Sequence, residues 1–249
     1  MIRLQIVPCP PELTAEEKAN LTAQFVADKS KKVWDRGYIK AALRIMSHGK
    51  CCYCETNISE ESKYMEVEHF KCKSAHPGDV VSWENLLPSC KRCNMEKGDY
   101  DVMNSGMLVD PSKMEPKLHL LLQENYRLRH KSRIGHDTIE ELYLNDSERL
   151  VSVRFMIGET VNNSLDLIYR DAEILLHDPT NRKYQKRVLR ALKSLLNQAS
   201  PSTPFSATAA TCILRNEKYN YMMLELIKLD LWDEDMAVAH SVAINICLI

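Results

Sequence analysis

Two amphipathic helical patterns open the chain. A capping box over residues 14–17 predicts a helix that runs to about residue 29. A second helix is expected over residues 38–47, because three apolar side chains recur there at helical spacing and share one face. These side chains are Ile39, Leu43 and Met46. The pair His48-Gly49 predicts the end of this helix.

The pattern changes between residues 50 and 101, where cysteine pairs, short alternating segments and polar turns replace helical periodicity. Residues 64–70 alternate between polar and apolar side chains, which predicts a short strand that ends in Glu68-His69. This stretch is therefore expected to differ in architecture from the helical segments on either side of it.

Helical periodicity returns in the second half of the chain. Helices are expected over residues 117–123, 138–144, 161–196 and 206–229. The segment SPSTP at residues 200–204 predicts the clearest break between them. Residues 232–249 are too apolar for an exposed tail, so they are expected to form the last core element, with a subunit interface as the alternative.

Together these patterns predict a mainly α fold with a small ββα module set between helical segments. We expect an N-terminal helical segment over residues 1–47, a metal-bearing module over residues 48–105, and a C-terminal helical region over residues 106–249 that docks a partner. The 249 residues give ample length for a buried core, and only 7 glycines argue against an all-β fold.

Composition restricts the class further. Apolar residues make up 45 % and charged residues 27 % of the chain, which is typical of a globular protein. We find no apolar run of about 18 residues and no secretory apolar region, so we expect no membrane span and a cytoplasmic location. In that setting the 9 cysteines are expected to be thiols or metal ligands rather than disulfides.

Two CxxC pairs predict a structural zinc site. Cys51 and Cys54 form the first pair, and Cys90 and Cys93 form the second. Four thiolates can complete the tetrahedron that structural Zn²⁺ prefers. Cys52 is an alternative in the first pair, but its spacing to Cys54 is poor. The 35 residues between the pairs exceed the common zinc-ribbon gap, which indicates that they carry something more.

Three short segments around this gap carry groups suited to phosphodiester hydrolysis. Glu68-His69 ends the predicted strand, Asn85 precedes an apolar run, and Asn94 follows the second cysteine pair. Histidine can deprotonate water near neutral pH, and hard oxygen ligands can hold Mg²⁺ or Mn²⁺ against a phosphate. Each segment alone has an ordinary structural interpretation, such as a surface pair, a turn or a cap. The prediction therefore depends on their combination.

At these residues the chain resembles the zinc-stapled branch of the HNH endonuclease superfamily. The matching segments are GKCCYCE, VEHF, WENLLPSC and CNMEKGD. The resemblance implies a ββα-metal (HNH) nuclease module in which His69 is the general base, Glu68 and Asn94 hold the catalytic cation, and Asn85 orients the histidine through the loop backbone. It also implies a phosphate contact for Lys97.

One position departs from the family pattern. Members often have proline three residues after the histidine, where this chain has Cys72. We interpret Cys72 as a turn residue, with a redox-sensitive thiol beside the metal as the alternative.

The resemblance extends beyond these motifs. The segments HGKCCYCE and VEHF, the later LVDPSKMEP and the helical tail resemble PtuB, the HNH subunit family of Septu-type antiphage systems, related forms of which accompany some retrons. That family works beside an ATPase called PtuA, so the resemblance implies a defence effector with an ATPase partner. Two alternatives are a stand-alone restriction-like or mobile-element HNH endonuclease, and a non-catalytic zinc-ribbon binding module.

The charge of the chain argues against a tight independent nucleic-acid binder. The formal net charge is -1, and residues 46–105 contain seven basic and ten acidic residues. Because affinity for DNA or RNA backbones comes largely from Lys and Arg, positive surface must be local or come from a partner. The candidates are Lys71, Lys73, Arg182, Lys186 and Arg190. The last three share one helical face, which could contact nucleic acid, contact an acidic partner or simply face solvent.

Overall fold

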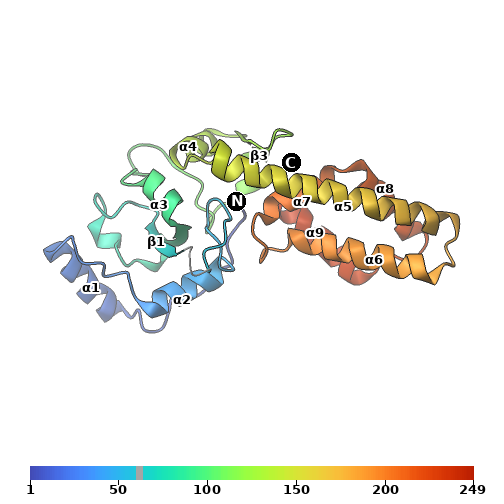
Figure 1. Cartoon of the computed structure of the whole chain (residues 1–249). Coiled ribbons are helices and arrows are strands. Elements are labelled where there is room, and N and C mark those ends of the chain that lie inside the picture. Colours follow the sequence, from blue (N-terminus) through green and yellow to red (C-terminus); the bar gives the residue numbers. More distant parts are fainter. Residues whose placement is uncertain (60–63) are drawn as a thin grey trace. The chain divides into compact units, whose positions relative to one another are not determined.

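The computed structural model of the chain describes residues 1–59 and 64–249 (Figure 1). It divides into two compact units. Unit 1 comprises Met1–Leu120 and Leu128–Asn145, and unit 2 comprises Leu121–Arg127 and Asp146–Ile249. This division differs from the predicted three parts, because residues 1–47 belong to the same unit as the cysteine pairs. Among the described residues, no helix is long and apolar enough to cross a membrane.

Unit 1 begins with the two predicted helices. Helix α1 spans Ala15–Ala27, and the hydroxyl of its N-cap, Thr14, accepts a hydrogen bond from the Glu17 backbone N–H at 3.1 Å. Helix α2 spans Gly37–Met46 and buries the predicted apolar face. It ends where His48 and Gly49 both adopt positive φ angles, which confirms the predicted stop.

A β–β–α segment follows in the same unit. Strand β1 (Met65–His69) pairs antiparallel with strand β2 (Leu86–Cys90), with His69 opposite Leu86. Two short 3₁₀ turns, Pro77–Asp79 and Trp83–Asn85, lie in the loop between the strands. Helix α3 (Lys91–Lys97) begins directly after β2, with Cys90 as its N-cap. The strand predicted to end at Glu68-His69 is confirmed.

The prediction of a helix over residues 117–123 is wrong. A 3₁₀ turn at Pro116–Leu118 is followed by strand β3 (Leu120–Leu122), which forms a two-stranded sheet with β4 (Leu128–His130). Burial alternates along β3, and a run of three leucines fits that period of two as readily as a helical one. Helix α4 spans Arg133–Glu141 and therefore begins before the predicted residue 138. The Ser132 side chain supplies its N-cap.

Unit 2 is helical around its own core. After a π-helical turn at Ser147–Val151, the helices are α5 (Ser152–His177), α6 (Arg182–Leu196), α7 (Ser206–Arg215), α8 (Glu217–Lys228) and α9 (Glu234–Ile246), with a 3₁₀ turn at Asn197–Ala199. The turn-rich stretch 200–205 separates α6 from α7 as predicted. The tail belongs to the core, since Met236, Ala243 and Leu248 are buried.

The single helix predicted over residues 206–229 is two helices. Asn216 ends α7 and caps α8, its side-chain oxygen accepting from the backbone N–H groups of Lys218 and Tyr219 at 3.0 and 3.2 Å. Hydrophobic periodicity cannot reveal such a cap, because apolar positions recur at helical spacing on both sides of it. The helical periodicity over residues 161–196 likewise belongs to two helices, since α5 ends at His177 and α6 begins at Arg182.

Candidate functional site

The four predicted zinc ligands come together in unit 1. The sulfur atoms of Cys51, Cys54, Cys90 and Cys93 all lie within 4.8 Å of one another. The first pair sits in a tight turn held by the Cys51 backbone N–H, which donates to the Thr56 carbonyl at 2.8 Å. The second pair spans the start of α3. Cys52 is buried but lies outside the tetrad.

The tetrad fits a zinc ion. Zn–S bonds of about 2.3 Å in a tetrahedron place neighbouring sulfurs about 3.8 Å apart, and Cys54 Sγ lies 3.8 Å from Cys90 Sγ. Burial is the main cause that raises the pKa of Cys51 well above its usual range. Because several thiolates in one buried cluster need a compensating cation, this donor set could hold a structural zinc ion.

His69 ends β1 with its ring anchored at one nitrogen. Nε2 lies 2.9 Å from the Val80 carbonyl oxygen. Since a carbonyl can only accept, Nε2 carries the hydrogen and Nδ1 has the free lone pair. Trp34 packs edge-on against the ring, with the centroids 4.7 Å apart. Burial lowers the pKa of His69 to about 4, so the ring is neutral near pH 7 and can accept a proton.

Asn85 ties together the loop that follows β1. Its side-chain oxygen accepts from the Lys71 backbone N–H at 2.7 Å, and its amide nitrogen donates to the carbonyls of Lys71 and Asp79, each at 3.1 Å. Asp79 directly precedes Val80, whose carbonyl holds the His69 ring. The Asn85 side chain is therefore linked to the histidine through the loop backbone.

Glu68 is a buried carboxylate with two side-chain partners. Lys97 Nζ lies 2.8 Å from Glu68 Oε1, and the Tyr53 hydroxyl donates to the same oxygen at 3.4 Å. Burial raises the pKa of Glu68, while Lys97 acts in the opposite direction. Lys97 also donates to the His69 carbonyl at 2.8 Å. Lys97 is the residue predicted to contact phosphate, but its ammonium already has two partners inside the protein.

Asn94 on α3 reaches back to β1. Its amide nitrogen donates to Glu66 Oε2. The sequence interpretation did not single out Glu66, although strand alternation places residues 66 and 68 on one face of β1. That alternation is the signal that could have found it. Glu66, Glu68 and Asn94 all line one cavity of about 740 Å³ and together offer several hard oxygen donors.

The same cavity includes side chains from far outside the motif segments. His69, Cys72 and Lys73 line it, and so do Trp34 and several basic residues of the N-terminal segment. The basic ones are Lys29, Lys32, Lys40 and Arg44. The sequence interpretation gave this segment no part in the site, because nothing local in it signals an approach to residues 66–94.

The remaining predicted contacts occupy different surroundings. Lys71 is partly exposed and pairs with Asp79 at 3.0 Å, and the Lys73 ammonium lies 5.4 Å from the Trp34 ring centroid. Arg182, Lys186 and Arg190 are exposed on α6 in unit 2. The opposite face of α6 is buried as predicted, so the amphipathic pattern is confirmed.

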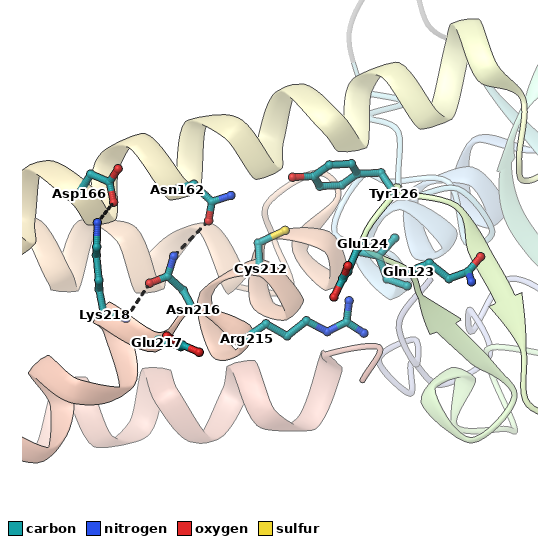
Figure 2. A pocket seen from close by; sticks show the side chains of 11 residues that line it. Gln123, Glu124, Tyr126, Asn162, Asp166, Cys212, Arg215, Asn216, Glu217 and Lys218 are labelled. Carbon is teal, nitrogen blue, oxygen red and sulfur yellow. Dashed lines mark hydrogen bonds and ion pairs between the residues drawn. The ribbon is translucent and has the colours of Figure 1, made fainter.

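Unit 2 has a cavity of about 530 Å³ with a different character (Figure 2). Its polar side chains bind one another: Asn216 Nδ2 donates to Asn162 Oδ1 at 3.1 Å, and Lys218 pairs with Asp166 at 2.6 Å. Burial raises the pKa of Cys212, which also lines it, to about 11. That thiol is protonated near neutral pH and is not an activated nucleophile.

Comparison with curated proteins decides the family. The Septu protein PtuB of Bacillus thuringiensis is 38% identical over 236 residues, which cover 94% of this chain and 90% of that protein. The chain belongs to the PtuB family. A second member, the Septu protein PtuB of Bacillus mycoides (strain KBAB4), is 30% identical over 79% of each chain. No protein-family model matches the chain, and no solved structure matches it.

The PtuB similarity spans both units. The alignment covers nearly the whole chain, so it includes the helical unit 2 as well as the cysteine tetrad and the cavity beside it. Membership in the PtuB family therefore applies to the complete architecture and not only to the short motif segments.

Proposed function

We propose that this chain is a metal-dependent HNH nuclease that hydrolyses phosphodiester bonds in DNA or RNA. One observation carries the proposal. His69, whose Nδ1 keeps its lone pair, lines the same cavity as Glu66, Glu68 and Asn94, which offer hard oxygen donors. The β–β–α segment and the cysteine tetrad support this assignment, because they fix the strand and the helix that carry these groups.

The donor set fits Mg²⁺ or Mn²⁺, which would polarise the phosphate and stabilise the leaving oxygen. Glu68 and Asn94 would hold the cation, and Glu66 is placed to join them. Lys97 favours the charged form of Glu68 and so acts against the rise in pKa that burial causes, since its ammonium lies 2.8 Å from the carboxylate.

His69 would take a proton from the attacking water at Nδ1. Its Nε2–H is committed to the Val80 carbonyl, which fixes both the tautomer and the ring plane. Asn85 would act as a positioning residue, since it holds the neighbouring Asp79 carbonyl at 3.1 Å and thereby the loop that carries Val80. The burial of Glu68 and His69 strengthens the electrostatic interactions of these two groups.

We further propose that the chain acts as an antiphage defence effector beside an ATPase subunit of the PtuA kind. The PtuB relatives support this role, since both are named as Septu proteins. Unit 2 supplies suitable docking surface. Met156 and Leu167 on α5 are 65% and 62% exposed and line an apolar groove of about 760 Å³ against α6. Lys186 and Arg190 border an adjoining cavity that shares Leu167, so an acidic amphipathic segment would match it.

Cleavage assays test the nuclease proposal. The full chain, with and without its ATPase partner, is incubated with labelled DNA and RNA in Mg²⁺ or Mn²⁺. We expect cleavage by the wild type, and none by His69→Ala at equal zinc content and equal thermal stability. Equal cleavage by both proteins would refute His69 as the base. No cleavage of either nucleic acid by the partnered, zinc-loaded wild type would favour the binding-module alternative.

A further inference from the structure

The segment from Lys29 to Arg44 carries a clear excess of positive charge. It contains six basic residues and one acidic residue, whereas the whole chain has a net charge of -1. The basic residues are Lys29, Lys31, Lys32, Arg36, Lys40 and Arg44. The segment connects α1 to α2 and includes most of α2. Its positive charge is therefore concentrated in one stretch of unit 1.

This segment faces the candidate catalytic groups. Lys29, Lys32, Lys40 and Arg44 line the cavity that also contains Glu68, His69 and Asn94. Lys40 pairs with Asp35. Lys32 and Arg44 are exposed, and within residues 1–59 and 64–249 no acidic side chain forms an ion pair with either of them. Their charge is thus available to a ligand that enters the cavity.

Aromatic contacts attach the segment to the site. Trp34 packs edge-on against His69, and Phe25 of α1 packs edge-on against Trp34 with centroids 5.8 Å apart. Lys73, from the loop after β1, lies 5.4 Å from the Trp34 ring centroid, and Lys29 lies 4.7 Å from the Phe25 centroid. Two lysines are therefore placed along a line of packed rings that ends at the candidate base.

We propose that the segment Lys29–Arg44 forms the nucleic-acid-binding wall of the cavity and binds the phosphate backbone on either side of the bond to be cut. This inference rests on the proposed nuclease function. Acidic and amide oxygens lie on β1 and α3, while most of the cationic side chains that line the cavity come from the segment Lys29–Arg44. A strand of phosphates matches that arrangement, because a cation would bind the scissile phosphate and lysine or arginine would contact its neighbours.

The positive charge of this wall also offsets the negative charge of the motif segments. Residues 46–105 have three more acidic than basic residues. Without the wall, a polyanion approaching Glu66 and Glu68 would meet a predominantly negative surface. Deoxyribose and ribose backbones share the phosphate chemistry recognised here, so the experiment must distinguish DNA from RNA.

A charge-matched pair of triple variants tests the wall. The wall variant is Lys29→Ala/Lys32→Ala/Arg44→Ala, and the control is Lys183→Ala/Lys186→Ala/Arg190→Ala on α6. Each removes two lysines and one arginine that are exposed. Both are made in full-length His69→Ala protein, so that cleavage does not interfere. Binding of labelled single-stranded and duplex DNA and RNA is measured by fluorescence anisotropy from about 0.05 to 0.2 M salt.

We expect the wall variant to bind the preferred nucleic acid at least about tenfold more weakly at the lowest salt. The slope of log K against log salt should fall by about 2–3 because three phosphate contacts are lost. The α6 control should lose less affinity. The wall is refuted if its variant binds like the parent, if the control loses as much, or if the parent binds none of the four nucleic acids.

The same proteins separate the wall from the nuclease proposal. In a parallel series that retains His69, the wall variant should raise KM while leaving unfolding and zinc content unchanged. If the wild type fails to cut yet binding still maps to Lys29, Lys32 and Arg44, the nuclease proposal fails and the wall stands. If the wild type cuts and the wall variant binds and cuts normally, the wall fails and the nuclease proposal stands.

Discussion

The ammonium of Lys97 lies 2.8 Å from a carboxylate oxygen of Glu68, and both side chains are almost completely buried. The pair joins α3 to β1 and sits directly beside His69, whose carbonyl also accepts from Lys97. A lysine that sequence similarity assigns to phosphate thus contacts the carboxylate that similarity assigns to the metal. The direct effect of the Lys97 ammonium is to favour the charged form of the Glu68 carboxylate.

Replacing this lysine should affect both stability and pH dependence. Lys97→Met leaves a buried carboxylate without its cation, which typically costs about 3–5 kcal/mol. The pKa of Glu68, already raised by burial, should rise further. Because Glu68 must be ionised to hold a cation, the acidic limb of the pH–rate profile should move to higher pH. Urea unfolding and a pH profile measure the two effects.

The conservative variant Lys97→Arg is the control for this prediction. It keeps a positive charge, so more of the stability and a smaller displacement of the acidic limb are expected. A Lys97→Met protein with the wild-type pH profile would show that this lysine does not act through Glu68.

Asn85→Ala should slow cleavage without removing any group that touches the substrate. The variant loses three hydrogen bonds to the loop backbone, at Lys71 and Asp79, and so loosens the Val80 carbonyl that holds His69. We expect kcat to fall about 10- to 100-fold with little change in KM, because positioning and not binding is lost. The control is Asn104→Ala, which removes an exposed side-chain amide that donates to Asp101. A change confined to KM would contradict the assignment.

Acid should destabilise unit 1 through His69. Burial lowers the pKa of His69 from 6.5 to about 4, so the unfolded chain binds a proton in this window and the folded chain does not. The free energy of unfolding should therefore be highest above about pH 6.5 and fall as the pH decreases towards 4, by about 3 kcal/mol from this group. In His69→Gln this part of the slope should disappear, which urea unfolding of metal-matched samples at several pH values can measure. An identical slope in both proteins would contradict the burial of a neutral ring.

Loss of zinc should unfold the site, whereas loss of a neighbouring thiol should not. Cys51→Ser removes one ligand of the tetrad, and structural zinc contributes about 10–16 kcal/mol to folding in small zinc domains. We expect little soluble protein and no stoichiometric zinc. Cys52→Ser is the control, because Cys52 is equally buried but outside the tetrad. Metal analysis that finds well-folded, zinc-free wild type would refute the zinc site.

The isolated chain should cut slowly at physiological salt. Because the net charge of the chain is -1, the wall of basic residues attracts nucleic acid only locally. At 0.15 M ionic strength, salt screens this attraction over about 8 Å. Adding the ATPase subunit should therefore increase both binding and cleavage. Met156→Glu/Leu167→Glu in the unit 2 groove should abolish the stimulation but leave the basal rate unchanged. Full stimulation of that variant would place the docking surface elsewhere.

Local spacing in the sequence was sufficient for several features. Two CxxC pairs indicated the tetrad, since two-residue spacers allow both sulfurs of a pair to reach one ion. Alternation indicated β1, and helical periodicity indicated the buried face of α2 and the amphipathic face of α6. These features depend on residues within a few positions of one another, where the geometry of the backbone alone determines which side chains share a face.

Tertiary structure decided what those elements contact. The three leucines of β3 fit a strand or a helix, and only a second strand that satisfies their backbone hydrogen bonds selects the strand. Lys97 looks like a surface residue until α3 packs on β1 and buries its ammonium against Glu68. Trp34 reaches His69 across 35 positions of sequence. Such contacts form because apolar burial and charge pairing act between whole elements, and no periodicity within one element encodes its neighbour.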